Sequence, residues 1–332
     1  MRYLLCYSHG SSGLCLCQNN VPLNGPLNGA VGGSVEFRLI NPPPPPFQHI
    51  IWTFKNAPII TLAGGGEIVY PGYVDRVSVD ETTASLLLKN LTVNDTGEYA
   101  VSTFSNTASR GETTLTVFEI IQTDPIISSG GTLIAGNSSV NLTCDVRGTI
   151  ITREWVKDGE PLSPSNRTTF HEKNRTLSIS LVEKEDNGLY MCNVSNPIST
   201  DTSNHQLLIN YGPHNVIITA PQMVTTGDSV SLQCAADSVP LPSFTWMLYG
   251  VEIGDKSELV IDKVVLSHAG VYSCVALNSI TSHRVSTTHT LDVRDSNPLS
   301  EGTIAGIVIG SAAGICLVAG LLAFGLKKAG VW

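Results

Sequence analysis

Short segments in which apolar and polar residues alternate recur three times along the chain. They are residues 34–40, 139–144 and 229–234, and, in the middle of each repeat, residues 84–89, 176–181 and 258–261. A period of two places successive side chains on opposite faces of a strand, so these segments predict half-buried strands of antiparallel sheets. Clusters of Gly, Pro, Asn and Asp separate them, without a long helical period. The pattern predicts an all-β fold of three tandem β-sandwiches.

A shared motif aligns the three repeats. Each has a Ser-Val pair opening the strand, a Trp further on (Trp52, Trp155, Trp246), and then a Tyr preceded two residues earlier by Gly. Cysteines flank this motif in the second and third repeats, at Cys144 and Cys192 and at Cys234 and Cys274. These four cysteines should form two disulfides, which implies an oxidising compartment. In the first repeat Leu39 and Val101 stand at the cysteine positions.

The spacing of Cys, Trp and Tyr-x-Cys resembles that of the immunoglobulin superfamily. The resemblance implies two facing sheets, a disulfide that crosses between them, a Trp packed on the disulfide and a Tyr that makes a corner hydrogen bond. The interval from Trp to Tyr is 47 residues in the first repeat, 35 in the second and 26 in the third. The long first interval has room for the extra C′ and C″ strands of a variable-type domain, and the shorter repeats resemble C2- or I-type domains.

Two acidic residues are spaced to pair with an arginine in this fold. Arg76 lies 19 residues before Asp95, and Arg167 lies 19 residues before Asp186. The resemblance implies an ion pair in each case. The third repeat has His268 at the Asp position and no matching Arg, so we expect this ion pair to be missing there, since an unpaired buried charge would be costly.

A run of 25 residues without charge, 302–326, precedes the C-terminus. A helix of this length can span a bilayer. Lys327 and Lys328 follow at once, which predicts a cytosolic C-terminus and extracellular repeats, as in a single-pass type I protein of the plasma membrane in contact with lipid. One face of this helix would carry a small residue at every fourth position, for close packing on a second helix or for contact with lipid alone. These residues are Gly302, Gly306, Gly310 and Gly314.

The patterns divide the chain into seven segments. We expect a signal peptide of atypical sequence at 1–20, a variable-type domain without a disulfide at 21–119, C2/I-type domains at 120–211 and 212–294, a stalk at 295–301, the transmembrane helix at 302–326 and a cytoplasmic tail at 327–332. Residues 9–13 interrupt the apolar stretch of the leader, so a degraded or wrongly joined leader and a disordered extension remain alternatives.

Charge and motifs exclude several functions. The net charge is −9 and no basic tract occurs, which argues against a nucleic-acid partner. No catalytic motif is found, so we expect no enzyme activity, no catalytic residue, no metal and no cofactor. Seven Asn-x-Ser/Thr sequons predict glycans on the first two repeats and none on the third. They are Asn90, Asn94, Asn137, Asn141, Asn166, Asn174 and Asn193.

The first repeat resembles the carcinoembryonic-antigen-related cell adhesion molecules, through residues 68–71, residues 84–90 and the run 94–99. Hepatocyte and SLAM-type adhesion receptors share parts of this domain organisation, in which a variable-type domain precedes C2-type domains. The resemblance implies homophilic adhesion through the sheet of strands G, F, C and C′. Alternation from Trp52, Tyr99 and Val101, which face inward, predicts six outward positions on that sheet. They are Ile51, Thr53, Lys55, Ala100, Ser102 and Phe104.

Ile51 and Phe104 are the apolar members of this set and are the expected anchors of an interface, although Phe104 could instead fold into the loop that follows. The hypothesis is therefore a cell–cell adhesion receptor whose partner is a second copy, in cis or in trans, or another cell-surface immunoglobulin protein. The alternative is a heterophilic immune or pathogen-binding receptor, or a short-tailed decoy.

Overall fold

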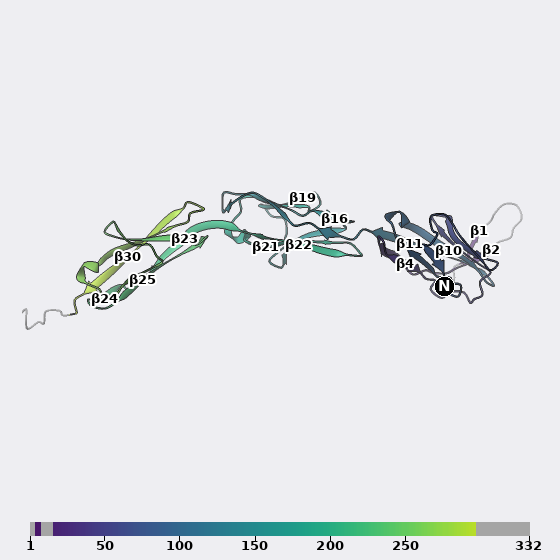
Figure 1. Cartoon of the computed structure of the whole chain (residues 1–332), viewed down its shortest axis with the longest axis horizontal. Coiled ribbons are helices and arrows are strands. Elements are labelled where there is room, and N and C mark those ends of the chain that lie inside the picture. The colour runs from purple at the N-terminus through teal and green to yellow at the C-terminus, as the bar shows by residue number, and fades with distance from the viewer. Residues whose placement is uncertain (1–3, 8–15, 297–332) are drawn as a thin grey trace, which may run out of the picture. The chain divides into compact units, whose positions relative to one another are not determined.

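The computed structural model describes residues 4–7 and 16–296, whose regular elements are strands and three short 3-10 turns (Figure 1). The chain divides into two compact units between Leu208 and Ile209. The first unit holds two β-sandwiches and the second unit holds one. Among the described residues, no helix has the length and apolar character needed to cross a membrane. The predicted transmembrane helix at 302–326, with its four glycines, and the tail at 327–332 lie outside these residues.

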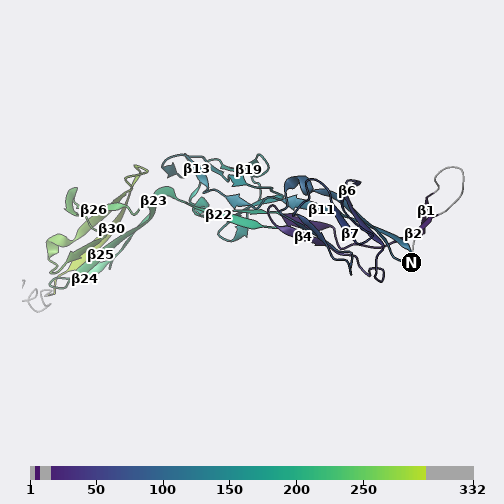
Figure 2. The ribbon, with the colours of Figure 1, turned by 45° about the vertical axis from the view of Figure 1, so that its right-hand side comes forward.

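The first sandwich has a wide front sheet and a narrow back sheet (Figure 2). The front sheet runs β1 (Leu4–Tyr7), β2 (Leu16–Asn20), β11 (Ala108–Phe118), β10 (Gly97–Phe104), β5 (His49–Phe54), β6 (Ala57–Ala63) and β7 (Gly66–Val69), with β3 (Leu27–Ala30) also pairing with β11. The back sheet runs β4 (Ser34–Phe37), β9 (Leu86–Lys89) and β8 (Val77–Val79). β6 and β7 lie in the long interval between Trp52 and Tyr99, where the sequence predicts two additional strands.

Residues predicted as a leader pair with this front sheet. β1 and β2 form an antiparallel hairpin, and β2 pairs in parallel with β11 at Ser109 and Arg110. The signal peptide at 1–20 stays a prediction.

The second sandwich has two four-stranded sheets. One runs β13 (Ile127–Ser129), β15 (Val140–Thr143), β20 (Thr176–Ile179) and β19 (Thr168–His171). The other runs β18 (Glu160–Pro161), β17 (Thr152–Lys157), β21 (Gly188–Ser195) and β22 (Thr200–Leu207). β12 (Gln122–Thr123) pairs with β16 (Val146–Arg147), and β14 (Leu133–Ile134) precedes β15.

In the third sandwich a five-stranded sheet packs against a smaller sheet. The larger sheet runs β24 (Met223–Thr225), β30 (Arg284–Arg294), β29 (Gly270–Leu277), β26 (Ser243–Leu248) and β27 (Val251–Gly254). The smaller sheet includes β23 (Ile209–Thr219), β25 (Val230–Val239) and β28 (Glu258–Ile261). One 3-10 turn precedes the Tyr strand of each sandwich: η1 (Val93–Asp95), η2 (Lys184–Asp186) and η3 (Leu266–His268).

The predicted boundary between residues 211 and 212 falls inside β23, whereas the division between the units falls before Ile209. The Tyr211 carbonyl accepts hydrogen bonds from Asn278 Nδ2 at 3.0 Å and from Ser238 Oγ at 3.2 Å. Both donors belong to the third sandwich, so Tyr211 contacts that sandwich, and the domain bounds stay a prediction.

Each core repeats the same two polar contacts. The indole N–H groups of Trp52, Trp155 and Trp246 donate to the carbonyls of Ala84, Asn174 and Lys256 at 3.0, 2.7 and 2.9 Å. The hydroxyls of Tyr99, Tyr190 and Tyr272 donate to the carbonyls of Asp95, Asp186 and His268 at 2.9, 3.0 and 2.9 Å. Buried polar groups are therefore satisfied in the same way in all three sandwiches.

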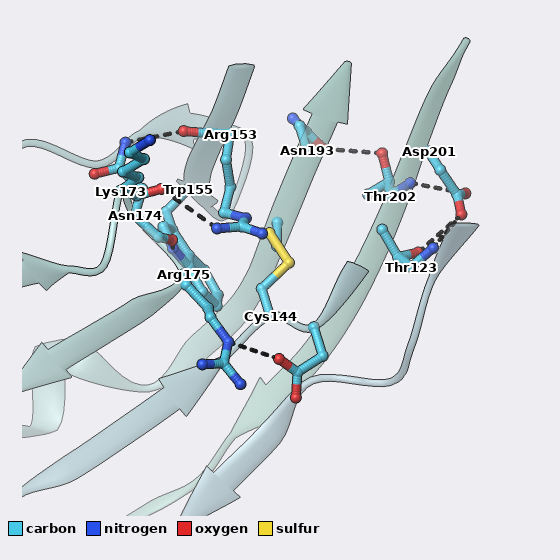
Figure 3. Close-up of a disulfide and its surroundings, with 12 residues drawn as sticks. Thr123, Cys144, Arg153, Trp155, Lys173, Asn174, Arg175, Asn193, Asp201 and Thr202 are labelled. Carbon is cyan, nitrogen blue, oxygen red and sulfur yellow. Dashed lines mark hydrogen bonds and ion pairs between the residues drawn. A yellow bond between two sulfur atoms is a disulfide. The ribbon is translucent and has the colours of Figure 1, made fainter. Parts of the chain in front are cut away.

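Disulfides cross between the sheets of two sandwiches. Cys144 bonds to Cys192, beside Trp155 (Figure 3), and Cys234 bonds to Cys274. Both pairs are fully or almost fully buried, as the packing of an inter-sheet bridge requires.

In the first sandwich the same position holds an apolar cluster. Leu39 and Val101 are 7% and 1% exposed. Phe37, where the other repeats have Leu, places its ring 4.5 Å from that of Tyr99 and 5.7 Å from that of Trp52. The Phe37 ring therefore strengthens a core that has no covalent bridge.

Reduction of the two disulfides should destabilise the second and third sandwiches and leave the stability of the first unchanged. The bridges close loops with sequence separations of 48 and 40 residues. The chain-entropy relation assigns each about 4 kcal/mol. Dithiothreitol should accelerate amide hydrogen exchange in β15, β21, β25 and β29 and leave β5 and β10 unchanged, as followed by mass spectrometry. Equal acceleration in β5 and β10 would contradict the apolar account of the first core.

Candidate functional site

The outward side chains of β11, β10, β5, β6 and β7 form one surface, which we call the front face. Strand register places Arg110, Ser102, Ile51, Thr61 and Ile68 in one row across the five strands. Their neighbours Val101 and Trp52 are buried in the core, so alternation directs this row away from it. The row is the centre of the front face.

Three apolar side chains, Ile51, Ile68 and Phe104, lie on the front face. Ile68 is 60% exposed, and Ile51 is half-buried two strands away. Phe104 is also half-buried and stacks on His49 of the paired strand, with ring centroids 5.5 Å apart and planes tilted by 11°. Phe104 therefore lies over β5 and is held on the sheet.

Charged side chains line the β11 edge of the same face. Arg110 and Glu112 are exposed, and each is paired across the strands with an outward residue of β10, Ser102 and Ala100. An apolar strip bordered by charges of both signs fits a protein interface better than a small-molecule cleft.

Two predicted face residues depart from the expectation. Ala100 is only 4% exposed, because a methyl group on a sheet flanked by Thr53 and Glu112 is covered by longer neighbours. Lys55 follows the end of β5 with φ of 49°, and its Nζ lies 4.6 Å from the centroid of the Phe54 ring. The strand alternation therefore stops before Lys55, which packs on Phe54 at the end of the sheet.

Thr53 and Ser102 lie on the front face as expected and are half-buried. The hydroxyl of Thr53 donates to the Ala100 carbonyl at 3.3 Å. Residues that the sequence interpretation did not single out are His49, Ile68, Arg110 and Glu112. The alternation on β11 could have indicated the last two, but Ile68 and His49 become relevant only through strand pairing.

Both sequons of the first sandwich lie away from the front face. Asn90 follows β9 of the back sheet, and Asn94 belongs to η1. Both are exposed. Glycans at these positions would leave the front face open.

The second sandwich carries the other five sequons. Asn137, Asn141, Asn166 and Asn174 are exposed, whereas Asn193 is half-buried. Asn174 Nδ2 donates to the Arg153 carbonyl at 2.9 Å, and Asn193 Oδ1 accepts from the Thr202 hydroxyl at 2.9 Å (Figure 3).

The structure brings together both predicted ion pairs. Arg76 Nη2 lies 2.5 Å from Asp95 Oδ2, and this carboxylate is 6% exposed. Arg167 Nη1 lies 2.7 Å from Asp186 Oδ2, which is 14% exposed. In the third sandwich, His268 Nδ1 accepts from the Val265 amide at 3.1 Å, as Asp95 Oδ2 accepts from Thr92 at 2.7 Å. His268 thus keeps the backbone contact of the missing Asp.

The buried tyrosines stay protonated. Burial, followed by the negative charge of Asp95, raises the pKa of Tyr99 far above its ordinary value. Burial and Asp186 do the same for Tyr190. Within residues 4–7 and 16–296, no three His, Cys, Asp or Glu side chains are grouped to hold a metal ion.

Comparison with known proteins agrees with this architecture. The immunoglobulin I-set domain family matches residues 129–209, and a second immunoglobulin domain family matches residues 214–278. The chain belongs to the immunoglobulin superfamily.

Among curated proteins, the chain is 31% identical to mouse HEPACAM family member 2 and 30% identical to its human counterpart, each over 275 residues. The alignments cover 73% of this chain and 58% of each relative, so the chain spans less than two thirds of their length.

Two solved structures share the fold. Murine CEACAM1b aligns with a TM-score of 0.50 and 24% identity over 57% of this chain and 98% of that one. The full ectodomain of mouse nectin-like molecule 4 aligns with a TM-score of 0.55 and 20% identity over 83% of this chain and 99% of that one.

Removing one partner of the better buried ion pair should destabilise the first sandwich. Arg76→Ala leaves the Asp95 carboxylate buried without its cation, and we expect a loss of about 3 kcal/mol in the free energy of unfolding, measured by urea denaturation. The matched control is Arg38→Ala, which breaks an exposed pair with Glu36 and should cost less than about 1 kcal/mol. Equal losses would refute a structural role for the pair.

Proposed function

We propose that this chain is a single-pass type I glycoprotein of the plasma membrane that mediates cell–cell adhesion, and that the front face of the first sandwich binds a second copy. The observation that carries the proposal is the front face itself: an apolar strip of Ile51, Ile68 and Phe104 on a wide sheet, bordered by Arg110 and Glu112.

Several features support this assignment. A twofold pairing of front faces would bury the apolar strips against each other and could place charges of opposite sign in contact. The sequons of the first sandwich lie elsewhere. The sequence relatives named above belong to the HEPACAM family, and the nectin-like molecule shares the immunoglobulin fold.

Charged substitutions on the front face should abolish adhesion. Beads coated with residues 1–296 should aggregate, and Phe104→Asp and Ile68→Asp should each prevent this, because a buried unpaired carboxylate opposes association. Ile68 is 60% exposed, so its substitution should leave the fold intact. Val74→Asp, equally exposed outside the five strands, is the control and should aggregate normally. Normal aggregation of both front-face variants with unchanged melting temperatures would overturn the assignment.

Self-association distinguishes a second copy from a different receptor. Analytical ultracentrifugation of residues 1–296 at high micromolar concentration should show dimers, and Phe104→Asp should remove them. A monomer under these conditions would favour the heterophilic alternative, in which another cell-surface immunoglobulin protein or a pathogen protein uses the same face.

A further inference from the structure

The third sandwich carries a cluster of exposed apolar side chains at one end, formed by turns and strand ends. We call it the apolar rim. Its members are Tyr249, Val251, Val265, Leu266 and Val271, which are 73%, 64%, 44%, 56% and 51% exposed. Exposed apolar side chains that gather in one place indicate a contact surface, whereas scattered ones do not.

Hydrogen bonds and strand pairing hold these residues at the same end. The Tyr249 hydroxyl is hydrogen-bonded to the carbonyl of Ala269, between η3 and β29. Leu248 pairs with Tyr272, so the next residues along, Tyr249 and Val271, are neighbours in the same register. Val265 and Leu266 lie at the start of the same η3 turn.

The described chain also ends here. Gly227, in the turn after β24, donates its amide to the Val264 carbonyl at 2.8 Å. Thr226, one residue earlier, accepts from the Ser296 amide at 3.0 Å. These two hydrogen bonds connect Ser296, the last described residue, to Val264, which precedes the rim residue Val265 (Figure 1 shows β24 at this end).

Chain length then limits what the rim can face. The apolar run predicted to span the membrane begins at residue 302, six residues after Ser296. Six extended residues reach at most about 20 Å. We propose that the apolar rim rests on the outer leaflet of the membrane that anchors the chain, with Leu266, Val265 and Val251 entering the interface and Tyr249 at the headgroup level. This rests on the predicted anchor of the proposed function.

Three features favour lipid over a second copy as the occupant. The rim consists of turns and strand ends at one end of the sandwich, so it offers no flat sheet for a sheet-to-sheet contact. Tyr with Val and Leu is the combination that suits a membrane–water interface, since the phenol has an apolar ring and a polar tip. No sequon occurs in the third repeat, so no N-linked glycan would hold this end away from the headgroups.

Fluorescence quenching by lipid tests the proposal on the full chain in phosphatidylcholine–phosphatidylserine vesicles. A fluorescent amino acid replaces Leu266, or replaces Leu241 as the matched control. Leu241 is 88% exposed in the turn between β25 and β26, at the opposite end of the sandwich. Brominated phosphatidylcholine should quench the probe at 266 and not the probe at 241. The triple variant Tyr249→Ser, Val251→Ser, Val271→Ser should lose the quenching at 266.

Three results would overturn the proposal: no quenching at 266, equal quenching at both positions, or release of the chain from the vesicles by alkaline extraction. Within the first of these results, a probe at 266 that is shielded from aqueous iodide would mean that a protein covers the rim. Bead aggregation through the front face is measured separately, so a chain that aggregates without quenching disproves only the membrane contact.

Discussion

The contact between the two sheets of each sandwich, beside the buried Trp, is the constraint on which the rest of the structure depends. In the second and third sandwiches this contact is a disulfide. In the first it is made by Leu39, Val101 and the ring of Phe37. Burial of each such side chain contributes about 1.5–3 kcal/mol, which is enough together to replace a bridge of about 4 kcal/mol. The first core is therefore complete without a covalent link.

The first sandwich also has a wider front sheet than the other two. β6 and β7 extend it beyond β5, and a shift in register between Trp52 and Thr53 directs both Ile59 and Ile60 into the core. The added strands place Ile68 on the same outward row as Ile51. The width of the sheet, more than any single residue, brings Ile51 and Ile68 onto one face.

Sequence alone predicted the features that depend on spacing. Alternation placed Trp52, Tyr99 and Val101 inward, and all three are buried in the structure. The resemblance to the immunoglobulin superfamily implied a contact between Arg76 and Asp95, and these side chains lie together. Strand geometry determines the first of these features, and the family topology determines the second.

Other features depend on neighbours that alternation cannot identify. Ala100 points outward but is buried by the strands beside it, and Lys55 falls in a turn where alternation ends. Phe104 of β10 is positioned by stacking on His49 of β5. His49 precedes the start of β10 by 48 residues, so only strand pairing brings the two rings together. The burial of a side chain, the pairing of two strands and the position of a turn are properties of the folded sheet, so only the structure establishes them.

Hydrogen exchange of residues 1–296 in the associated state tests the central claim most directly. Residues 1–296 would be compared free at low concentration and densely attached to beads, with exchange followed by mass spectrometry. The account predicts slower exchange at the ends and edges of β5, β6, β7, β10 and β11, and no change in the second and third sandwiches. Protection confined to the second or third sandwich, or none at all on aggregated beads, would contradict it.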